Sequence, residues 1–173
     1  MAHSPISIND RTVEIVSVFK FLGIQLSNCL SWQTNTDYLV KKAQQRLYFL
    51  RRLKKIGMSN SILVNFYRSV IESILTYAIT VWFNNITKDE LNSLERVVRT
   101  AQRIIGTELP SLHSIYQTRT MHKAKAIIQD FSHPAYDLFK LLPSGKRYRA
   151  IRTRTERFRK SFYPSAIRIL NRT

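Results

Sequence analysis

The stretch from Ser61 to Phe83 constrains the fold of this chain more than any other. It is predicted to be a helix, and apolar side chains occupy most of its surface. A helix of this kind must be enclosed by neighbouring elements. Arg68 and Glu72, spaced four residues apart, favour a buried amphipathic helix over a membrane span. The polar stripe consists of Asn65, Arg68, Glu72, Thr76 and Thr80.

A second helix is predicted between Trp32 and Gly57. Its apolar residues recur at helical spacing on one face, and Gly57 ends the pattern. That face is made of Leu39, Ala43, Leu47, Leu50 and Leu53.

Further helices are predicted toward the C-terminus. Thr87 and Glu90 form a capping box at the start of one helix, and Gly106 is a natural stop at the end of the same helix. Another helix is expected from Pro110 to about Asp130, and a short one over 135–142. The inward residues of the helix after Pro110 are predicted to be Leu112, Ile115, Ala124, Ile127 and Ile128.

The first residues predict a β-hairpin. Ile6 and Ile8 alternate with polar residues, Asn9-Asp10-Arg11 has turn chemistry, and a β-branched run over 13–18 follows. The stretch VFKFLGIQL, residues 18–26, is predicted to be a strand with a break at Gly23. A strand this short needs a covering partner, because an isolated hairpin is marginal in water.

Together these patterns predict a mainly α fold: a helical bundle of four to five helices, an N-terminal β-hairpin and a basic C-terminal arm. The expected organisation is a hairpin over 1–32, a helical domain over 33–145 and an Arg-rich arm over 146–173. The arm is expected to be extended and then briefly helical.

The charge balance indicates a polyanionic partner. There are 28 Lys and Arg against 11 Asp and Glu, a net charge of +17. Residues 34–56 contribute +6 and residues 146–173 contribute +9. A field of this size favours nucleic acid first and anionic membrane surfaces second. Cys29 is the only cysteine, which excludes an intramolecular disulfide or a multi-cysteine zinc site.

The N-terminus has neither the basic n-region nor the apolar h-region of a signal peptide. The protein is therefore expected to be soluble and intracellular, with the choice between nucleus and cytoplasm open, and no membrane partner is expected.

The helix after Trp32 carries the strongest candidate binding surface. Cations along a helix face can follow a nucleic-acid backbone and release its counterions. The alternative is a solvated charged face, but such faces usually mix both signs, and acidic residues are nearly absent here. The stripe consists of Lys41, Gln45, Tyr48, Arg52 and Lys55, flanked by Lys42 and Arg46 and by Arg51 and Lys54.

The C-terminal arm is a second candidate, because it mixes cations with rings that can stack on bases. The alternative is that its aromatic residues pack back on the helices. The cations are Arg147, Arg149, Arg152, Arg154, Arg157 and Arg159, and the rings are Tyr148, Phe158, Phe162 and Tyr163.

No catalytic constellation is found in the sequence. The aspartates at 10, 37, 89, 130 and 137 do not pair as a two-metal site requires. The histidines at 3, 113, 122 and 133 have no ligand spacing, and His133 before Pro134 is read as a helix-entry residue. Glycine-rich nucleotide loops are missing too. The chain is therefore predicted not to be an enzyme and to need no cofactor or metal.

Several segments resemble the C-terminal end of a non-LTR (LINE-type) retrotransposon reverse transcriptase. They include VEIVSVFKFLGIQLSNCLSW, KKAQQRLYFLRRLKK, NFYRSVIESILTYAITVWF and SHPAYDLFKLLPSGKRYR. This resemblance implies a primer-grip hairpin and a thumb that holds the template–primer duplex, without the palm and its aspartates. The primer-grip positions it implies are Phe19, Lys20, Phe21, Leu22 and Gly23, and the hairpin would pack on the missing palm domain or another protein.

Residues 35–75 also resemble the short helical N-terminal segment of an AlkB-family tRNA-modifying dioxygenase and methyltransferase. No facial triad and no glycine-rich cofactor loop accompany it, so no such activity follows.

The sequence favours a nucleic-acid-binding remnant of a reverse transcriptase, taking RNA, DNA or an RNA–DNA hybrid. The alternatives are a helical protein-interaction remnant without a nucleic-acid role, an AlkB-family N-terminal-like segment without its catalytic domains, and a fragment with no function as a folded unit.

Overall fold

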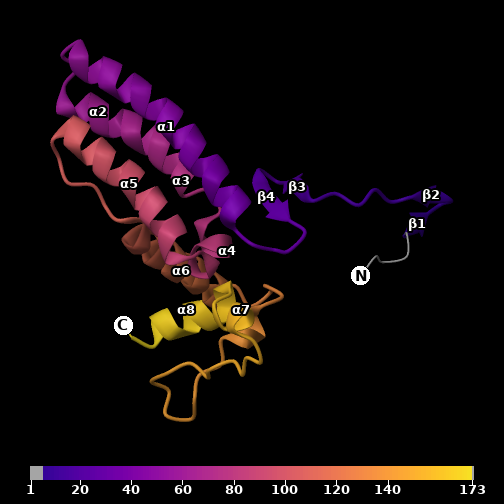
Figure 1. Ribbon diagram of the computed structural model, residues 1–173. Helices are drawn as coiled ribbons and strands as arrows, with labels where there is room; N and C mark the ends of the chain where they lie inside the picture. Colours follow the sequence, from indigo (N-terminus) through magenta and orange to yellow (C-terminus); the bar gives the residue numbers. More distant parts are fainter. Residues whose placement is uncertain (1–5, 173) are drawn as a thin grey trace.

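Helix α1 (Gln33–Lys55) is the longest element, and it lies in a layer of three helical segments and contacts the other two. One side contacts the segment that begins with α2 (Asn60–Phe66), and the other contacts α5 (Lys88–Ile105). Figure 1 shows this layer in the computed structural model, which describes residues 6–172. Helix covers 59% of the chain and strand 8%, which confirms the predicted mainly α class with an N-terminal β-hairpin.

The leucine face of α1 is buried as predicted. Leu39, Ala43, Leu47 and Leu50 are each less than 5% exposed, and Leu53 is half-buried. The helix ends as its sequence indicates. Gly57 adopts a φ of +80°, its N–H donates to the Lys54 carbonyl, and the Met58 N–H donates to the Leu53 carbonyl. These two bonds form a Schellman motif.

The predicted helix over Ser61–Phe83 is wrong as a single element. After α2 the chain forms a π-helical segment (Tyr67–Glu72), then α3 (Ser73–Leu75), α4 (Ile79–Trp82) and a 3₁₀ turn (Phe83–Asn85). Between α3 and α4, Ala78 adopts a φ of +46°.

Side-chain hydroxyls explain part of this interruption. Ser69, Ser73 and Thr76 each donate to the carbonyl four residues earlier, at 2.8, 2.6 and 2.7 Å. Such bonds compete with the helix ladder and bend it. The indole of Trp82 then donates to the Tyr77 carbonyl at 2.9 Å, so the break leaves that carbonyl paired.

The enclosed character of this stretch is nevertheless observed along one side. Leu63, Tyr67, Ile71, Leu75, Ile79 and Trp82 are at most 1% exposed and form the centre of the core. By length and composition alone, Asn60–Asn85 could also cross a membrane: its most apolar window has a mean hydropathy of 1.2 and is 33% buried in the fold. That no membrane partner exists stays a prediction.

Helix α5 begins with the predicted capping box. The Glu90 N–H donates to Thr87 Oγ1 at 3.2 Å, and Glu90 Oε2 accepts from the Thr87 N–H at 2.5 Å. Gly106, with a φ of +82°, closes the helix as expected. Helix α6 (Leu112–Gln129) follows, capped by Ser111.

Two hydrophobic cores are built along the chain, and α6 takes part in both. Leu112 and Tyr116, in its first half, belong to the core formed by α1, α5 and the broken helix. Ala124 and Ile127, in its second half, pack in a second core with Ala166 and residues near it. The second core also contains Ala135, Phe139 and Ile167, flanked by Ile128, Tyr148, Ile151, Phe162, Tyr163 and Leu170.

The short helix predicted over 135–142 is wrong, since only a 3₁₀ turn forms (Tyr136–Leu138). Beyond it the backbone pairs in an extended turn instead. The Leu142 N–H donates to the Arg147 carbonyl at 2.8 Å, and the Arg149 N–H donates to the Lys140 carbonyl at 2.7 Å. Two helices end the chain: α7 (Glu156–Arg159) and α8 (Phe162–Leu170).

From residue 6 onward, the N-terminal region holds two small antiparallel hairpins rather than one. β1 (Ser7–Ile8) pairs with β2 (Arg11–Thr12), and β3 (Val18–Phe21) pairs with β4 (Ile24–Ser27). The single strand predicted over 18–26 is therefore wrong: Leu22 and Gly23, with φ of +45° and +84°, turn the chain inside it. Positive φ at both central residues is what a two-residue hairpin loop of type I′ needs.

The β-branched run over 13–16 forms no strand. In Figure 1 the β1–β2 hairpin extends away from the helices, while β4 contacts α1. The strand β3 is exposed throughout, with Phe19 56% and Phe21 54% accessible. Within residues 6–172 this apolar strand is therefore left largely uncovered.

Candidate nucleic-acid interface

The cations of α1 lie on the side of the helix opposite its buried leucines. That separation follows from the helical period, because residues four or seven apart share a face. Tyr48, in the middle of the stripe, is 56% exposed. All predicted members of the α1 surface are exposed: Lys41, Lys42, Gln45, Arg46, Tyr48, Arg52 and Lys55.

These cations make no ion pair within the part of the chain that the structure describes. The three ion pairs of residues 6–172 all lie between Asp137 and Lys160. On α1 the cations meet aromatic rings instead. Lys42 Nζ lies 4.7 Å from the centre of the Tyr38 ring, and the Arg46 guanidinium lies 5.9 Å from that of Phe49. The charge of this face is therefore left for a partner or for solvent.

Helices α1 and α5 run side by side in the same direction. At their C-terminal ends, Lys54 Nζ donates to the Ile105 carbonyl at 3.3 Å. At their N-terminal ends, Asp37, Asp89 and Glu90 line one cavity of about 340 Å³. Each charge stabilises the helix end it lies near, acids at the N-termini and cations at the C-termini.

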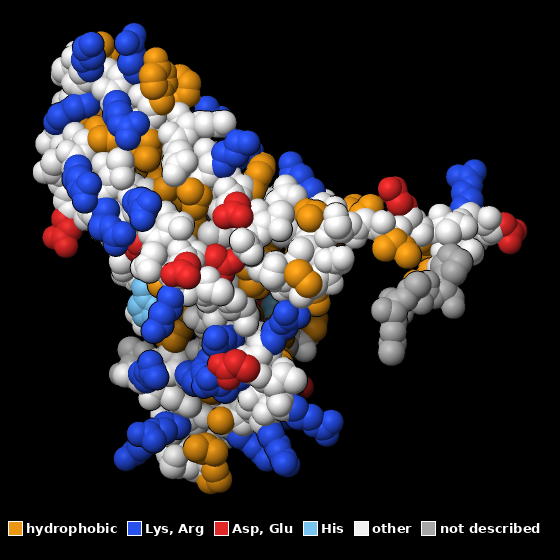
Figure 2. All heavy atoms as spheres, viewed as in Figure 1, with side chains coloured by type: hydrophobic (Ala, Val, Ile, Leu, Met, Phe, Trp, Pro, Cys, Tyr) orange, Lys and Arg blue, Asp and Glu red, His pale blue; other side chains and the backbone are white. Residues whose placement is uncertain are grey.

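This arrangement separates charge along the helical layer. In Figure 2, Lys and Arg gather over its upper part, while red acidic side chains lie lower, near its junction with the rest of the molecule.

Helix α5 adds cations that the sequence analysis missed. Arg51 of α1 and Arg96 of α5 line a polar notch of about 280 Å³ between the two helices, together with Gln44 and Thr100. Arg99 and Arg103 continue the exposed row on α5. The sequence carries a signal for this row, since Arg96, Arg99 and Arg103 recur at three- and four-residue spacing. Only the packing of α5 beside α1 shows that the two rows join.

The hairpin candidates meet the helical layer near Tyr77 and the first half of α1. Tyr77 Oη donates to the Leu22 carbonyl at 2.7 Å, and the Tyr77 ring lies against Gly23. Lys20 and Gly23 line a cavity of about 370 Å³ together with Tyr38, Lys42 and Tyr77.

This contact places one hairpin cation beside the α1 stripe. Interaction with Lys42, and with Lys20 from the hairpin, lowers the pKa of the Tyr38 phenol. Phe19 and Phe21 stay on the exposed strand.

The arginines of the C-terminal segment are exposed but lie apart from the α1 stripe. Figure 1 shows α7 and α8 beyond α6, at the far end of the molecule from the C-terminus of α1. Arg157 donates to the Leu30 carbonyl at 3.2 Å, and Arg159 forms a bidentate pair with Glu156 at 2.6 Å. The exposed arginines are Arg147, Arg149, Arg152, Arg154, Arg157 and Arg159.

The aromatic residues of this segment divide between two roles. Tyr148, Phe162 and Tyr163 pack against the second core, as the alternative interpretation expected. Phe158 is 44% exposed and is the ring of this set that remains open to a partner.

The titratable residues that the sequence analysis examined for catalysis form no metal site within residues 6–172. His133 Nδ1 accepts from the Ala135 N–H at 3.0 Å. The residue was predicted to enter a helix, but it precedes only the 3₁₀ turn Tyr136–Leu138. His113 lines a different cavity, described below, and His3 lies outside the described residues.

A family model described as alkylated DNA repair protein alkB homolog 8, N-terminal, matches residues 32–73. The matched stretch runs from the start of α1 through the π-helical segment and covers less than half of the chain. No curated protein and no solved structure matches. The match supports the AlkB-like resemblance of residues 35–75, and nothing in the comparisons supports the resemblance to a reverse transcriptase.

Proposed function

We propose that this chain is a non-catalytic segment, similar to the N-terminal part of alkB homologue 8, that binds the phosphate backbone of nucleic acid through α1. The observation that carries the proposal is the exposed row of cations on α1, which has no carboxylate partner within residues 6–172. Such a row releases counterions when it meets a polyphosphate.

The position of the family match supports this assignment. Residues 32–73 include every candidate residue on α1, and the matched family is named for an alkylated DNA repair protein. The partner class carried over from that name is nucleic acid alone, with no oxygenase or transferase activity. The resemblance to a reverse-transcriptase thumb implies the same partner, but the proposal does not rest on it.

The surroundings of α1 supply the contacts that backbone binding uses. Arg51 and Arg96 flank a notch beside the stripe, and Tyr48 presents an exposed ring within it. Phosphate contacts of this kind position a nucleic acid without reading its sequence. We therefore expect little dependence on sequence, with RNA, DNA and RNA–DNA hybrid all bound.

A second candidate function is protein interaction, and one observation favours it. The exposed rings of Phe19 and Phe21, with Leu22 at 73% exposure, form an apolar surface that no described residue fully covers. Large exposed apolar patches mark interaction sites. This function would use the hairpin and leave the α1 cations without a role.

The test is a titration across a salt series with duplex DNA, RNA–DNA hybrid and single-stranded RNA. If about five phosphates are neutralised, log K should fall with log salt at a slope of roughly −4 to −5 on duplex. Changing Lys41, Arg52 and Lys55 together to Gln should flatten the slope by about three. These side chains are exposed, so stability should change little.

The matched control removes the same charge elsewhere, by changing Arg147, Arg149 and Arg152 to Gln. The control should keep a slope close to that of the wild-type chain. A control that flattens the slope while the α1 variant leaves it unchanged would move the interface to the C-terminal segment. Absence of binding at low salt would reject the proposal in favour of protein interaction.

A further inference from the structure

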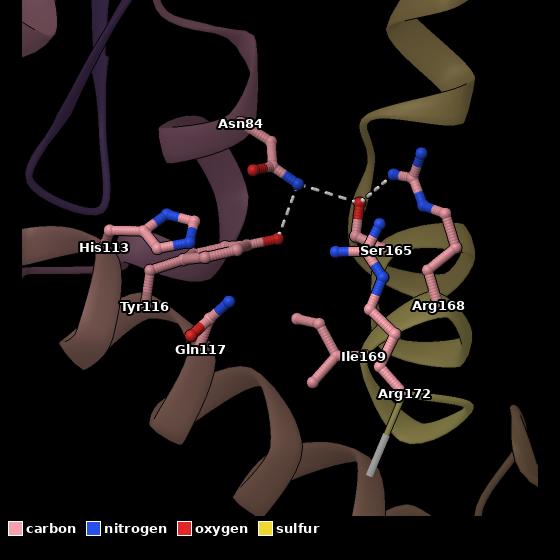
Figure 3. A pocket seen from close by; sticks show the side chains of 8 residues that line it. All are labelled: Asn84, His113, Tyr116, Gln117, Ser165, Arg168, Ile169 and Arg172. Carbon is pink, nitrogen blue, oxygen red and sulfur yellow. Dashed lines mark hydrogen bonds between the residues drawn. The ribbon is translucent and has the colours of Figure 1, made fainter.

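A polar cavity of about 200 Å³ lies between α6 and α8, away from the α1 surface. In Figure 3, α6 contributes one wall and α8 with the residues after it contributes the other, and Asn84 lies above them. Its lining has the chemistry of a hydrogen-bond donor site: two guanidiniums, two side-chain amides, an imidazole and hydroxyls. The residues with these groups include Asn84, His113, Gln117, Ser165, Arg168 and Arg172.

Both hydroxyls that line this cavity accept hydrogen bonds from neighbouring side chains. The Asn84 amide donates both of its hydrogens, to Tyr116 Oη at 2.7 Å and to Ser165 Oγ at 2.9 Å. Arg168 donates to Ser165 Oγ as well, at 2.9 Å. A hydroxyl has two acceptor lone pairs and one proton to donate. With both lone pairs of Ser165 occupied, its own proton is left to be donated.

The Tyr116 hydroxyl accepts one hydrogen bond, from Asn84, and finds no acceptor for its proton within residues 6–172. Tyr116 and Ser165 are both only 2% exposed. A buried donor without an acceptor costs free energy. An anion in the cavity would supply the acceptor that both hydroxyls lack.

The charge of the cavity points the same way. Arg168 and Arg172 both line it, and none of the described lining residues carries a carboxylate. One nitrogen of Arg168, Nη2, donates both to the Arg159 carbonyl, at 2.8 Å, and to Ser165 Oγ. A guanidinium has five N–H donors in a planar fork that matches phosphate oxygens, so donors remain on Arg168. The Arg172 side chain makes no hydrogen bond or ion pair with the described residues.

We propose that this cavity binds a phosphate group, as inorganic phosphate or as the terminal phosphate of a small monoester. A phosphate monoester carries between one and two negative charges near neutral pH and three strong acceptor oxygens. Two guanidiniums balance that charge, and the hydroxyls of Tyr116 and Ser165 donate to its oxygens. This site is separate from the proposed α1 interface and goes beyond it, because it takes one small anion rather than a polymer backbone.

The test uses the full chain and titrates inorganic phosphate at constant ionic strength, following the arginine Nε–H signals by NMR. A parallel titration uses a nucleoside monophosphate, which separates a monoester from the free ion. Arg172→Gln removes one exposed guanidinium and should fold normally. It should weaken phosphate binding by roughly tenfold or more, as expected for a hydrogen bond to a charged group.

Two further variants make the result specific. Lys125→Gln removes one positive charge from an exposed position on the same helix α6, and it should change the affinity by less than about twofold, since a distant surface charge is screened. Tyr116→Phe keeps the ring that stacks on Phe83, at 4.9 Å between centroids, but removes the buried donor. It should weaken binding as Arg172→Gln does.

Equal weakening by the Arg172 and Lys125 variants would overturn the proposal, because phosphate would then be responding to net charge alone. Unchanged binding in Tyr116→Phe would equally contradict the donor geometry. Failure of the wild-type chain to bind either anion at millimolar concentration would also reject the site, whatever the outcome at α1. Tighter binding of the monophosphate than of inorganic phosphate would show that the ligand is a phosphate monoester.

Discussion

Replacing Gly23 by Ala tests whether the apolar hairpin is held on the helical layer through its turn. Gly23 has a φ of +84°, and a Cβ built on it would lie 3.1 Å from Cε1 of Tyr77. The left-handed conformation costs an L-residue about 1–2 kcal/mol. The Tyr77 ring must also move, and its hydroxyl holds the Leu22 carbonyl at 2.7 Å.

The expected loss of 1–2 kcal/mol should be local, because the first core does not include the hairpin. A loss of this size corresponds to roughly a 5- to 30-fold change in an equilibrium constant. Native-state hydrogen exchange should show protection of the β3 and β4 amides falling by that factor. The amides of α5 should be unaffected.

Gly57→Ala is the matched control. Gly57 has nearly the same φ, +80°, but nothing lies within 4 Å of a Cβ built there. Both variants adopt the unfavourable backbone conformation, and only Gly23→Ala disturbs a neighbouring ring. The control should loosen the end of α1 and leave the hairpin amides unchanged. Unaltered hairpin exchange in Gly23→Ala, or equal loss across α5, would refute the reasoning.

Three other predictions concern single residues. Ala78→Gly should raise the free energy of unfolding by about 1 kcal/mol, because Ala78 adopts a φ of +46° that Gly takes without strain, and a lower urea midpoint would contradict this. Burial raises the pKa of the Glu72 carboxyl, so its effect on stability is most favourable below the unfolded pKa and is lost as pH rises through the folded pKa. Glu72→Gln should remove that decline in urea unfolding measured from pH 4 to 7, and an identical pH profile would refute it. Hydrogen bonds from Ser27 and Ser31 lower the pKa of the Cys29 thiol to about 7, so its alkylation rate should level off above pH 8 in the wild-type chain but still be rising there in Ser27→Ala.

The elements predicted well from the sequence depend on local chemistry. The capping box of Thr87 and Glu90, the stop at Gly57 and the leucine face of α1 each involve residues within a few turns of one another. Their hydrogen bonds and burial follow from helical spacing alone, so the observed helices agree with the sequence pattern.

The elements predicted poorly depend on backbone conformations that the residue types do not indicate. Leu22 and Ala78 both adopt positive φ, although neither is a glycine or an asparagine. Their turns split a predicted strand and a predicted helix. At Leu22 the Tyr77 hydroxyl, 55 residues away, contacts the turn, which no local pattern could reveal.

The candidate surfaces show the same division. The exposure of the α1 cations followed from the period of the helix. The joining of Arg51 with Arg96, and the convergence of α6 and α8 on Asn84, required the tertiary arrangement. Residues 81 positions apart, Asn84 and Ser165, meet through one hydrogen bond.

The first half of α6 packs in one core and its second half in the other, so this helix determines the order in which the two cores unfold. The second core needs α6 in place to pack against, and the first core is what anchors it through Leu112 and Tyr116. Unfolding of the second core would expose Ala124 and Ile127 but leave the first half of α6 packed in the first core. Unfolding of the first core would release α6 and so disrupt both cores. Unfolding should therefore be sequential, starting at the C-terminal end, and a mild protease should trim the chain from that side to a resistant remainder that ends within α6.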